Sequence, residues 1–249
     1  MALPPMPHIV AAQALAELAS VDLRYAWDDW NVHPYFRPGD AEVRERALGL
    51  SHRARIALTI AIAEWVVHRF DRVSADQLCH DYLEALWAWN IDWRYAIPFR
   101  PDDREWQGPI RGPLELALVI ANDAFETSEE QGASEAAPAW MSQLARHLLP
   151  DPAPFLSWRD AVIARLEQHH PWEYDEDDFF LEHDFRGARV PREIFDLSRA
   201  YDPSEAERLL AAFVRRLIGN PNPFLRDRAE LELLAEAEGW PYLWPGSLG

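Results

Sequence analysis

Apolar residues recur every three or four positions along most of the chain, a spacing that places them on one face of an α-helix. The clearest case follows Asp202 and Pro203, a pair typical of a helix start, and runs to Gly219, which is typical of a helix end. The stripe between them consists of Ala206, Leu209, Leu210, Phe213, Val214 and Leu217. We find no alternating β-branched run between hairpin turns, so the pattern predicts an all-α protein.

The same reasoning predicts about nine helices in a single domain spanning residues 1–249. Residues 40–70 fit one long helix or two helices broken near Gly49 and Ser51. The second half of that segment is apolar nearly all round, as a central core helix should be. A helix beginning near Ser74 places Cys79 on its apolar face. Further helices are expected at 8–20, 113–126, 138–149, 157–170, 191–200 and 222–239.

Two segments 69 positions apart resemble each other, since 151–159 reads DPAPFLSWR and 220–228 reads NPNPFLRDR. Each lies between two predicted helices. A duplication would make residues 138–170 and 203–238 two stacked helical hairpins, related to the stacking in α-solenoids. Convergent use of proline and phenylalanine at helix corners explains the same similarity without duplication, and both interpretations stay open.

The charged residues limit the range of possible functions more than any sequence motif does. The chain has 42 acidic residues, 24 arginines and no lysine, which gives a formal net charge of −18. The absence of lysine excludes Schiff-base chemistry and a phosphate-loop lysine, and the single cysteine excludes intrachain disulfides and cysteine-rich zinc sites. We therefore expect no bound cofactor and no direct contact with nucleic acid, because a strongly acidic protein repels polyanions.

The sequence also favours a cytoplasmic protein that does not enter membranes. The first basic residue is Arg24, so the positive start of a secretory signal is not found. The most apolar stretch, residues 56–67, is shorter than the roughly 20 residues that a bilayer crossing needs. A single cysteine fits a reducing compartment.

The acidic residues are concentrated in one part of the chain. Residues 126–190 contain 14 acids and 5 arginines. At the centre of this region, five carboxylates alternate with or adjoin aromatic rings: Trp172, Glu173, Tyr174, Asp175, Glu176, Asp177, Asp178, Phe179 and Phe180. Like charges at this density repel one another, so a cationic partner would stabilise the segment. A solvated loop that only keeps the protein soluble would have the same composition, and this alternative stays open.

A second aromatic and acidic group lies near the N-terminus, where Trp27 and Trp30 bracket Asp28 and Asp29. Aromatic side chains are the usual anchors of protein interfaces, and complementary charge speeds association. We therefore expect a non-enzymatic, acidic protein-binding module for a basic partner, with residues 172–179 and 27–30 in contact. A specific form would be an inhibitor or immunity-type protein that covers a basic enzyme.

Two alternatives from other functional classes remain. Glu167 and His170 share a helix face, and with His183 they could form a metal site of a helical enzyme near residues 167–184. The stretch 87–111 combines aromatic rings with arginines and could bind a planar or anionic small molecule. We find no standard catalytic signature and predict no catalytic residue.

Glu64 lies inside the apolar run, four residues before His68. If its carboxylate is buried without a partner, its pKa would rise and it could act as a general acid or base. Otherwise its side chain reaches water or an arginine.

Overall fold

The computed structural model describes residues 3–14, 23–74, 76–100, 106–126, 135–173, 186–217 and 221–238. Within these ranges the chain is all-α, as predicted, with ten α-helices, three short 3₁₀ helices and no strand. The α-helices are α1 (Pro7–Ala14), α2 (His33–Phe36), α3 (Ala41–Leu48), α4 (His52–Arg69), α5 (Leu78–Ile91), α6 (Gly108–Glu126), α7 (Ala136–Leu148), α8 (Ala153–His169), α9 (Ala206–Leu217) and α10 (Arg228–Glu238). The 3₁₀ helices are η1 (Trp93–Tyr95), η2 (Arg192–Phe195) and η3 (Pro203–Glu205).

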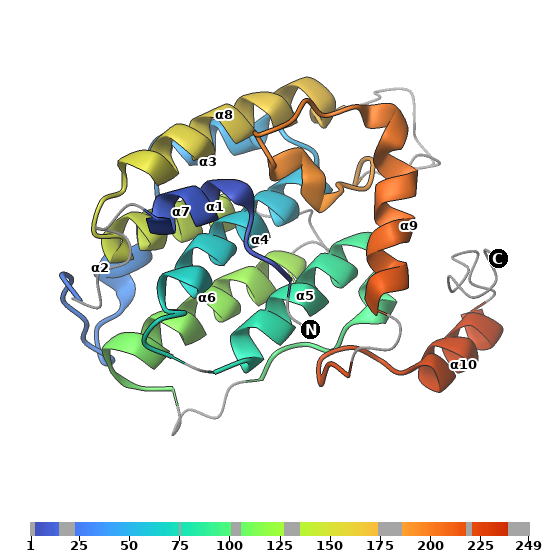
Figure 1. Ribbon diagram of the computed structural model, residues 1–249, viewed down its shortest axis with the longest axis horizontal. Helices are drawn as coiled ribbons and strands as arrows, with labels where there is room; N and C mark the ends of the chain where they lie inside the picture. Colours follow the sequence, from blue (N-terminus) through green and yellow to red (C-terminus); the bar gives the residue numbers. More distant parts are fainter. Residues whose placement is uncertain are drawn as a thin grey trace.

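Helix α4 forms the centre of the molecule, with α5, α6, α7 and α8 packed around it (Figure 1). Every residue of α4 except Arg53 is buried, which confirms the core helix expected from residues 56–67. A helix that is apolar on all sides gains free energy only when neighbours cover all of it. The surrounding helices supply that cover, so the fold is built around one buried helix.

The segment 40–70 forms two helices, because each has its own N-cap. Asp40 accepts a hydrogen bond from the Val43 amide at the start of α3, and the Ser51 hydroxyl accepts one from the Ala54 amide at the start of α4. From α4, the buried Arg55 donates to the carbonyl oxygens of Ala47 and Leu50 at 2.8 and 3.0 Å. Ala47 is in the last turn of α3 and Leu50 lies just beyond it, where carbonyls run short of helical donors, so the guanidinium supplies additional ones.

Helix α9 crosses the far end of α5 and closes a second, smaller apolar cluster (Figure 1). This cluster consists of Ala88, Ile91, Tyr95, Leu210, Val214, Leu217 and Leu231. The α9 members Leu210, Val214 and Leu217 belong to the stripe predicted from the sequence, and all three are buried. The amphipathic pattern therefore identified both the helix and the face that it buries.

Two predicted helices differ strongly from the observed ones, and α6 begins at Gly108 instead of residue 113. Residues 191–200 form only the short η2, since the Asp196 carboxylate accepts hydrogen bonds from the Ser198 amide and hydroxyl and holds a turn instead. The helix expected from Asn222 begins at Arg228. Asp227 is its effective cap, because it accepts from the Glu230 amide while the Glu230 carboxylate accepts from the Asp227 amide.

The two similar segments also take different conformations. In the first, Pro152 precedes α8, and Phe155 is fully buried in the core. The described part of the second forms a turn in which Leu225 bridges to Ala96, and Phe224 packs against Tyr82. Each phenylalanine thus fills an apolar corner, but only the first segment continues as a helix there. Among the described residues, no helix has both the length and the hydropathy that crossing a bilayer requires.

Candidate protein-binding surface

The Trp27–Trp30 group forms a compact turn that is held by its own acidic side chains. The Asp28 carboxylate accepts a hydrogen bond from the Trp30 amide at 2.9 Å, and the Asp28 carbonyl accepts one from the Asn31 amide at 3.0 Å. These two bonds fix the backbone on both sides of Trp30. The acidic residues of this turn therefore have a structural role besides their charge.

Asp29 connects the same turn to the start of α6. Its two carboxylate oxygens each lie 3.0 Å from the Gly108 amide, and Oδ1 also accepts a 2.7 Å hydrogen bond from the Trp27 indole nitrogen. Gly108 is the first residue of α6, so the carboxylate sits where the helix dipole favours a negative charge. This bond fastens the turn to a long helix of the core.

Stacked rings support the other side of the turn. The Trp27 ring stacks on Tyr35 at a centroid separation of 4.9 Å, and Tyr35 stacks on His147 of α7 at 4.5 Å. The His147 Nε2 atom lies 2.9 Å from the Ala26 carbonyl oxygen. Gly112 of α6 makes room for the indole, because a Cβ at that position would lie only 2.4 Å from the Trp27 Nε1 atom.

Trp30 itself is left in solvent by this framework. Its side chain is 92% exposed, the largest value among the large hydrophobic residues that the structure describes. Asp28 and Asp29 beside it are exposed as well. A rigidly mounted, exposed tryptophan flanked by carboxylates combines an apolar anchor with negative charge, which is the combination expected of a contact surface for a basic protein. We call residues 27–30 the Trp30 turn.

The second predicted contact segment is described only at its beginning. The Trp172 ring is half-buried and stacks on His52 at 4.5 Å, and its amide donates to the Gly49 carbonyl oxygen at 2.8 Å. Part of the Trp172 indole is therefore covered by other residues of the protein. Glu173 is exposed. The remaining members lie outside the described residues: Tyr174, Asp175, Glu176, Asp177, Asp178, Phe179 and Phe180.

The predicted metal ligands near residue 170 have other surroundings. Glu167 forms a two-point ion pair with Arg46, with both nitrogen–oxygen distances at 2.8 Å. His170 is buried, and neither of its ring nitrogens has a hydrogen-bond partner. Burial, helped by the neighbouring His169, lowers the pKa of His170 to about 4. His183 lies outside the described residues. The histidine and carboxylate side chains that the structure does bring close together are different ones: His68, Asp71 and His80.

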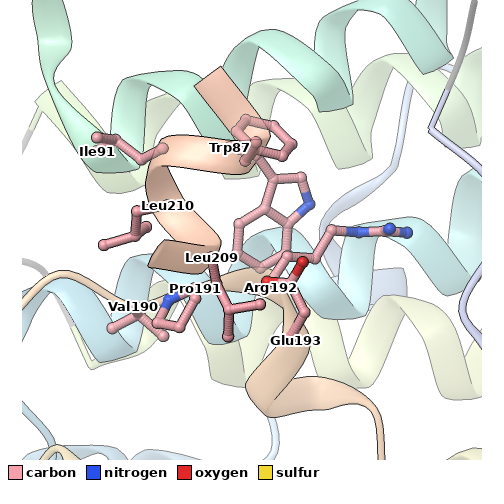
Figure 2. Close-up of a pocket in the computed structure, with 9 residues that line it drawn as sticks. Trp87, Ile91, Val190, Pro191, Arg192, Glu193, Leu209 and Leu210 are labelled. Atoms are coloured by element: carbon pink, nitrogen blue, oxygen red, sulfur yellow. The ribbon is translucent and has the colours of Figure 1, made fainter. Parts of the chain in front are cut away.

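The aromatic residues of 87–111 lie mostly in the core rather than around an open site. Trp87, Tyr95, Phe99 and Trp106 are all buried. Trp87 and Ile91 border a small hollow of about 10 Å³ whose other walls are residues 190–193 and α9 (Figure 2). That volume holds about one water molecule and is far below the roughly 300–1,000 Å³ usual for ligand pockets. Among the described residues, Arg192 is the one arginine that lines it.

The guanidinium of Arg192 is paired with the carboxylate of Glu64. Figure 2 shows its side chain running past the Trp87 indole, away from Leu210. Its guanidinium lies 2.7 Å from each Glu64 oxygen, and the Trp87 indole donates to the same carboxylate at 2.7 Å. Burial alone would raise the pKa of Glu64, but the charge and hydrogen bonds of Arg192 hold that pKa below its usual value. Glu64 is therefore a buried ion-pair partner and is not poised as a general acid or base.

Cys79 faces the core, as its position in the apolar stripe predicts. Burial raises the pKa of its thiol to about 12, so a thiolate does not form at neutral pH.

Comparisons of the sequence and of the structure with known proteins find no matching family model, no matching curated protein and no matching solved structure.

Proposed function

We propose that the protein is an acidic protein-binding module that recognises a basic partner, and that the Trp30 turn is its principal described contact. The observation that carries this proposal is the 92% exposure of Trp30 on a turn tied to α6 through Asp29 and Gly108. Holding a large ring in water offers no stability to the free chain. A partner that covers the ring gains binding free energy from the buried apolar area. Little conformational entropy is lost in return, because the turn is already ordered.

The charge of the molecule supports a basic partner. The formal net charge is −18, and Asp28, Asp29 and Glu173 are exposed in the described part of the two predicted contact segments. Opposite charge on the partner would steer the encounter, while Trp30 would prolong the complex. A specific form of the proposal is an inhibitor or immunity-type protein that covers a basic enzyme in the cytoplasm.

A paired capture experiment tests the proposal. Immobilised full-length protein and its Trp30→Ala variant are exposed to an extract of the native host, and the retained proteins are identified by mass spectrometry. Leu233→Ala is the matched control, because Leu233 is 68% exposed and lies on α10, outside both predicted contact segments. We expect a basic protein that the wild type and the control retain and that Trp30→Ala loses. Equal recovery by all three baits would overturn the proposal.

The inhibitor form has its own measurement. If the retained protein is an enzyme, its turnover is measured with and without the purified chain. We expect wild-type protein to suppress turnover at a concentration at which Trp30→Ala leaves it unchanged. Binding without suppression would keep the binding module and exclude the inhibitor.

A further inference from the structure

A cluster of metal-binding groups lies at one end of the α4–α5 hairpin, remote in sequence from the Trp30 turn. His68 is on the last turn of α4, Asp71 follows in the connecting turn, and His80 is on the first turn of α5. The connection reverses the chain, so α4 and α5 pack against each other and their adjoining ends meet. Three donors from a single hairpin thereby converge.

The donor atoms face one another at short range. The His68 Nδ1 atom lies 2.8 Å from Asp71 Oδ2, and the His80 Nε2 atom lies 2.9 Å from Asp71 Oδ1. All of the donor atoms lie within 4.8 Å of one another, and the two imidazole centroids are 4.9 Å apart. Among the described residues, no other group of three or more histidine, cysteine or carboxylate side chains meets at this spacing.

The backbone holds this arrangement before any ion arrives. The amides of Val73 and Ser74 both donate to the Phe70 carbonyl oxygen, at 2.9 and 2.8 Å, which closes the turn that carries Asp71. The His68 side chain is only 4% exposed and is therefore fixed by packing, whereas His80 is 18% and Asp71 34% exposed. One side of the cluster is buried and the other is open to solvent.

We propose that His68, Asp71 and His80 bind one divalent transition-metal ion of the Zn²⁺ class. Two imidazoles and one carboxylate are the ligand set that Zn²⁺ and its first-row neighbours prefer, and Mg²⁺ and Ca²⁺ prefer oxygen alone. Ligand atoms about 2.1 Å from a tetrahedral ion lie about 3.4 Å apart. The 2.8 and 2.9 Å separations run to different Asp71 oxygens, and the donor atoms lie within 4.8 Å of one another. Rotation of Asp71 and His80, the two more accessible side chains, must therefore bring one Asp71 oxygen and the two ring nitrogens to about 3.4 Å from one another.

Three protein ligands leave a tetrahedral ion one open position. Because His68 is buried and Asp71 is the most exposed of the three, that position faces the solvent side of the cluster. A water molecule or a small anion would complete the coordination there. The ion would also link the end of α4 to the start of α5, so that binding should stabilise the fold.

Metal titration of the full-length protein tests this site. Chelator-treated protein is titrated with Zn²⁺ by calorimetry and with Co²⁺ by visible absorption, with Mg²⁺ as the metal control. We expect one Zn²⁺ per chain, a Co²⁺ spectrum of low coordination number, a higher melting temperature with Zn²⁺ and no response to Mg²⁺. Loss of an outer-shell partner costs a metal site about 10–100-fold in affinity, so His80→Ala, which removes a ligand, should cost at least about 100-fold.

Two further variants make the result decisive. Asp71→Asn keeps the side-chain shape and should also weaken Zn²⁺ binding, so the test does not depend on whether His80→Ala folds. His33→Ala removes an exposed histidine outside the cluster and should bind Zn²⁺ as the wild type does. Absence of Zn²⁺ and Co²⁺ binding by the wild type, or equal binding by wild type and both cluster variants, would show a hydrogen-bonded cluster only and overturn the proposal.

Discussion

The guanidinium of Arg192 and the carboxylate of Glu64 form a buried two-point ion pair, with both nitrogen–oxygen distances at 2.7 Å. The pair joins the central helix α4 to η2, more than a hundred residues later in the chain. Glu64 is 2% exposed, and Arg192 is the largest of the groups that favour its charged form. The pair therefore helps to hold η2 on the core.

Arg192→Met should be strongly destabilising, because it leaves the Glu64 carboxylate buried without its cation. Removing one partner of a buried pair typically costs about 3–5 kcal/mol of the free energy of unfolding. Denaturant unfolding followed by circular dichroism measures the loss. The double variant Glu64→Leu with Arg192→Met should recover much of it, since no unpaired charge remains. A single variant as stable as the wild type would contradict this account of the pair.

The stability of the protein should fall with acid in a window set partly by His170. The pKa of this buried histidine is about 4 in the fold and about 6.5 in the unfolded chain, so the unfolded state binds more protons between these values. His170 therefore contributes stability above pH 6.5 that is lost as the pH falls towards 4, about 3 kcal/mol in all. In His170→Leu, unfolding free energy measured across this range should depend less steeply on pH. An unchanged slope would show that His170 is not buried in its neutral form.

Gly112→Ala should displace the Trp30 turn. A Cβ at residue 112 would lie 2.4 Å from the Trp27 Nε1 atom and 2.9 Å from Asp29 Oδ1, so the indole or the carboxylate must move. We expect a loss of about 1–3 kcal/mol in unfolding free energy, as for other overpacked sites, and weaker partner binding. Gly49→Ala is the control, since its nearest new contact is an ordinary 3.5 Å from the Arg46 carbonyl oxygen. Equal melting temperatures for the two variants would contradict the packing described here.

Charge removal from the acidic segment should slow association with the basic partner. One variant replaces four clustered acids by amides: Asp175, Glu176, Asp177 and Asp178. A control variant makes the same change in net charge at four exposed, dispersed acids: Glu42, Glu207, Glu232 and Glu236. Stopped-flow association at several salt concentrations should show a slower rate and a flatter salt dependence for the first variant than for the control. Equal rates would remove the segment from the contact.

The sequence predicted the helices well wherever an apolar stripe and a cap agreed. Of the two alternatives for residues 40–70, the structure has the two-helix one, with Ser51 as the cap of α4, and Leu210, Val214 and Leu217 identified the buried face of α9. The prediction failed where two caps competed. Asn222 resembles a helix start, but its side chain accepts from the Phe224 amide in a turn, and the Asp227 and Glu230 pair begins α10 six residues later.

The sites were harder to predict because they are assembled from separate elements. His68 and His80 were visible in the sequence, but only the chain reversal between α4 and α5 brings them to Asp71. Histidines at the end of one predicted helix and the start of the next, with an acid between them, were the available signal. The exposure of Trp30 depended on contacts with α6 and α7 that no local pattern reveals.

The lifetime of the partner complex tests the central claim most directly. The basic protein retained in the capture experiment is purified, and its dissociation rates from the wild type, Trp30→Ala and Leu233→Ala are measured by surface-based kinetics. An anchoring tryptophan is worth about 2 kcal/mol or more, so Trp30→Ala should dissociate about 30-fold faster, with Leu233→Ala unchanged. Dissociation of Trp30→Ala at the wild-type rate would contradict the assignment of the Trp30 turn as the binding surface.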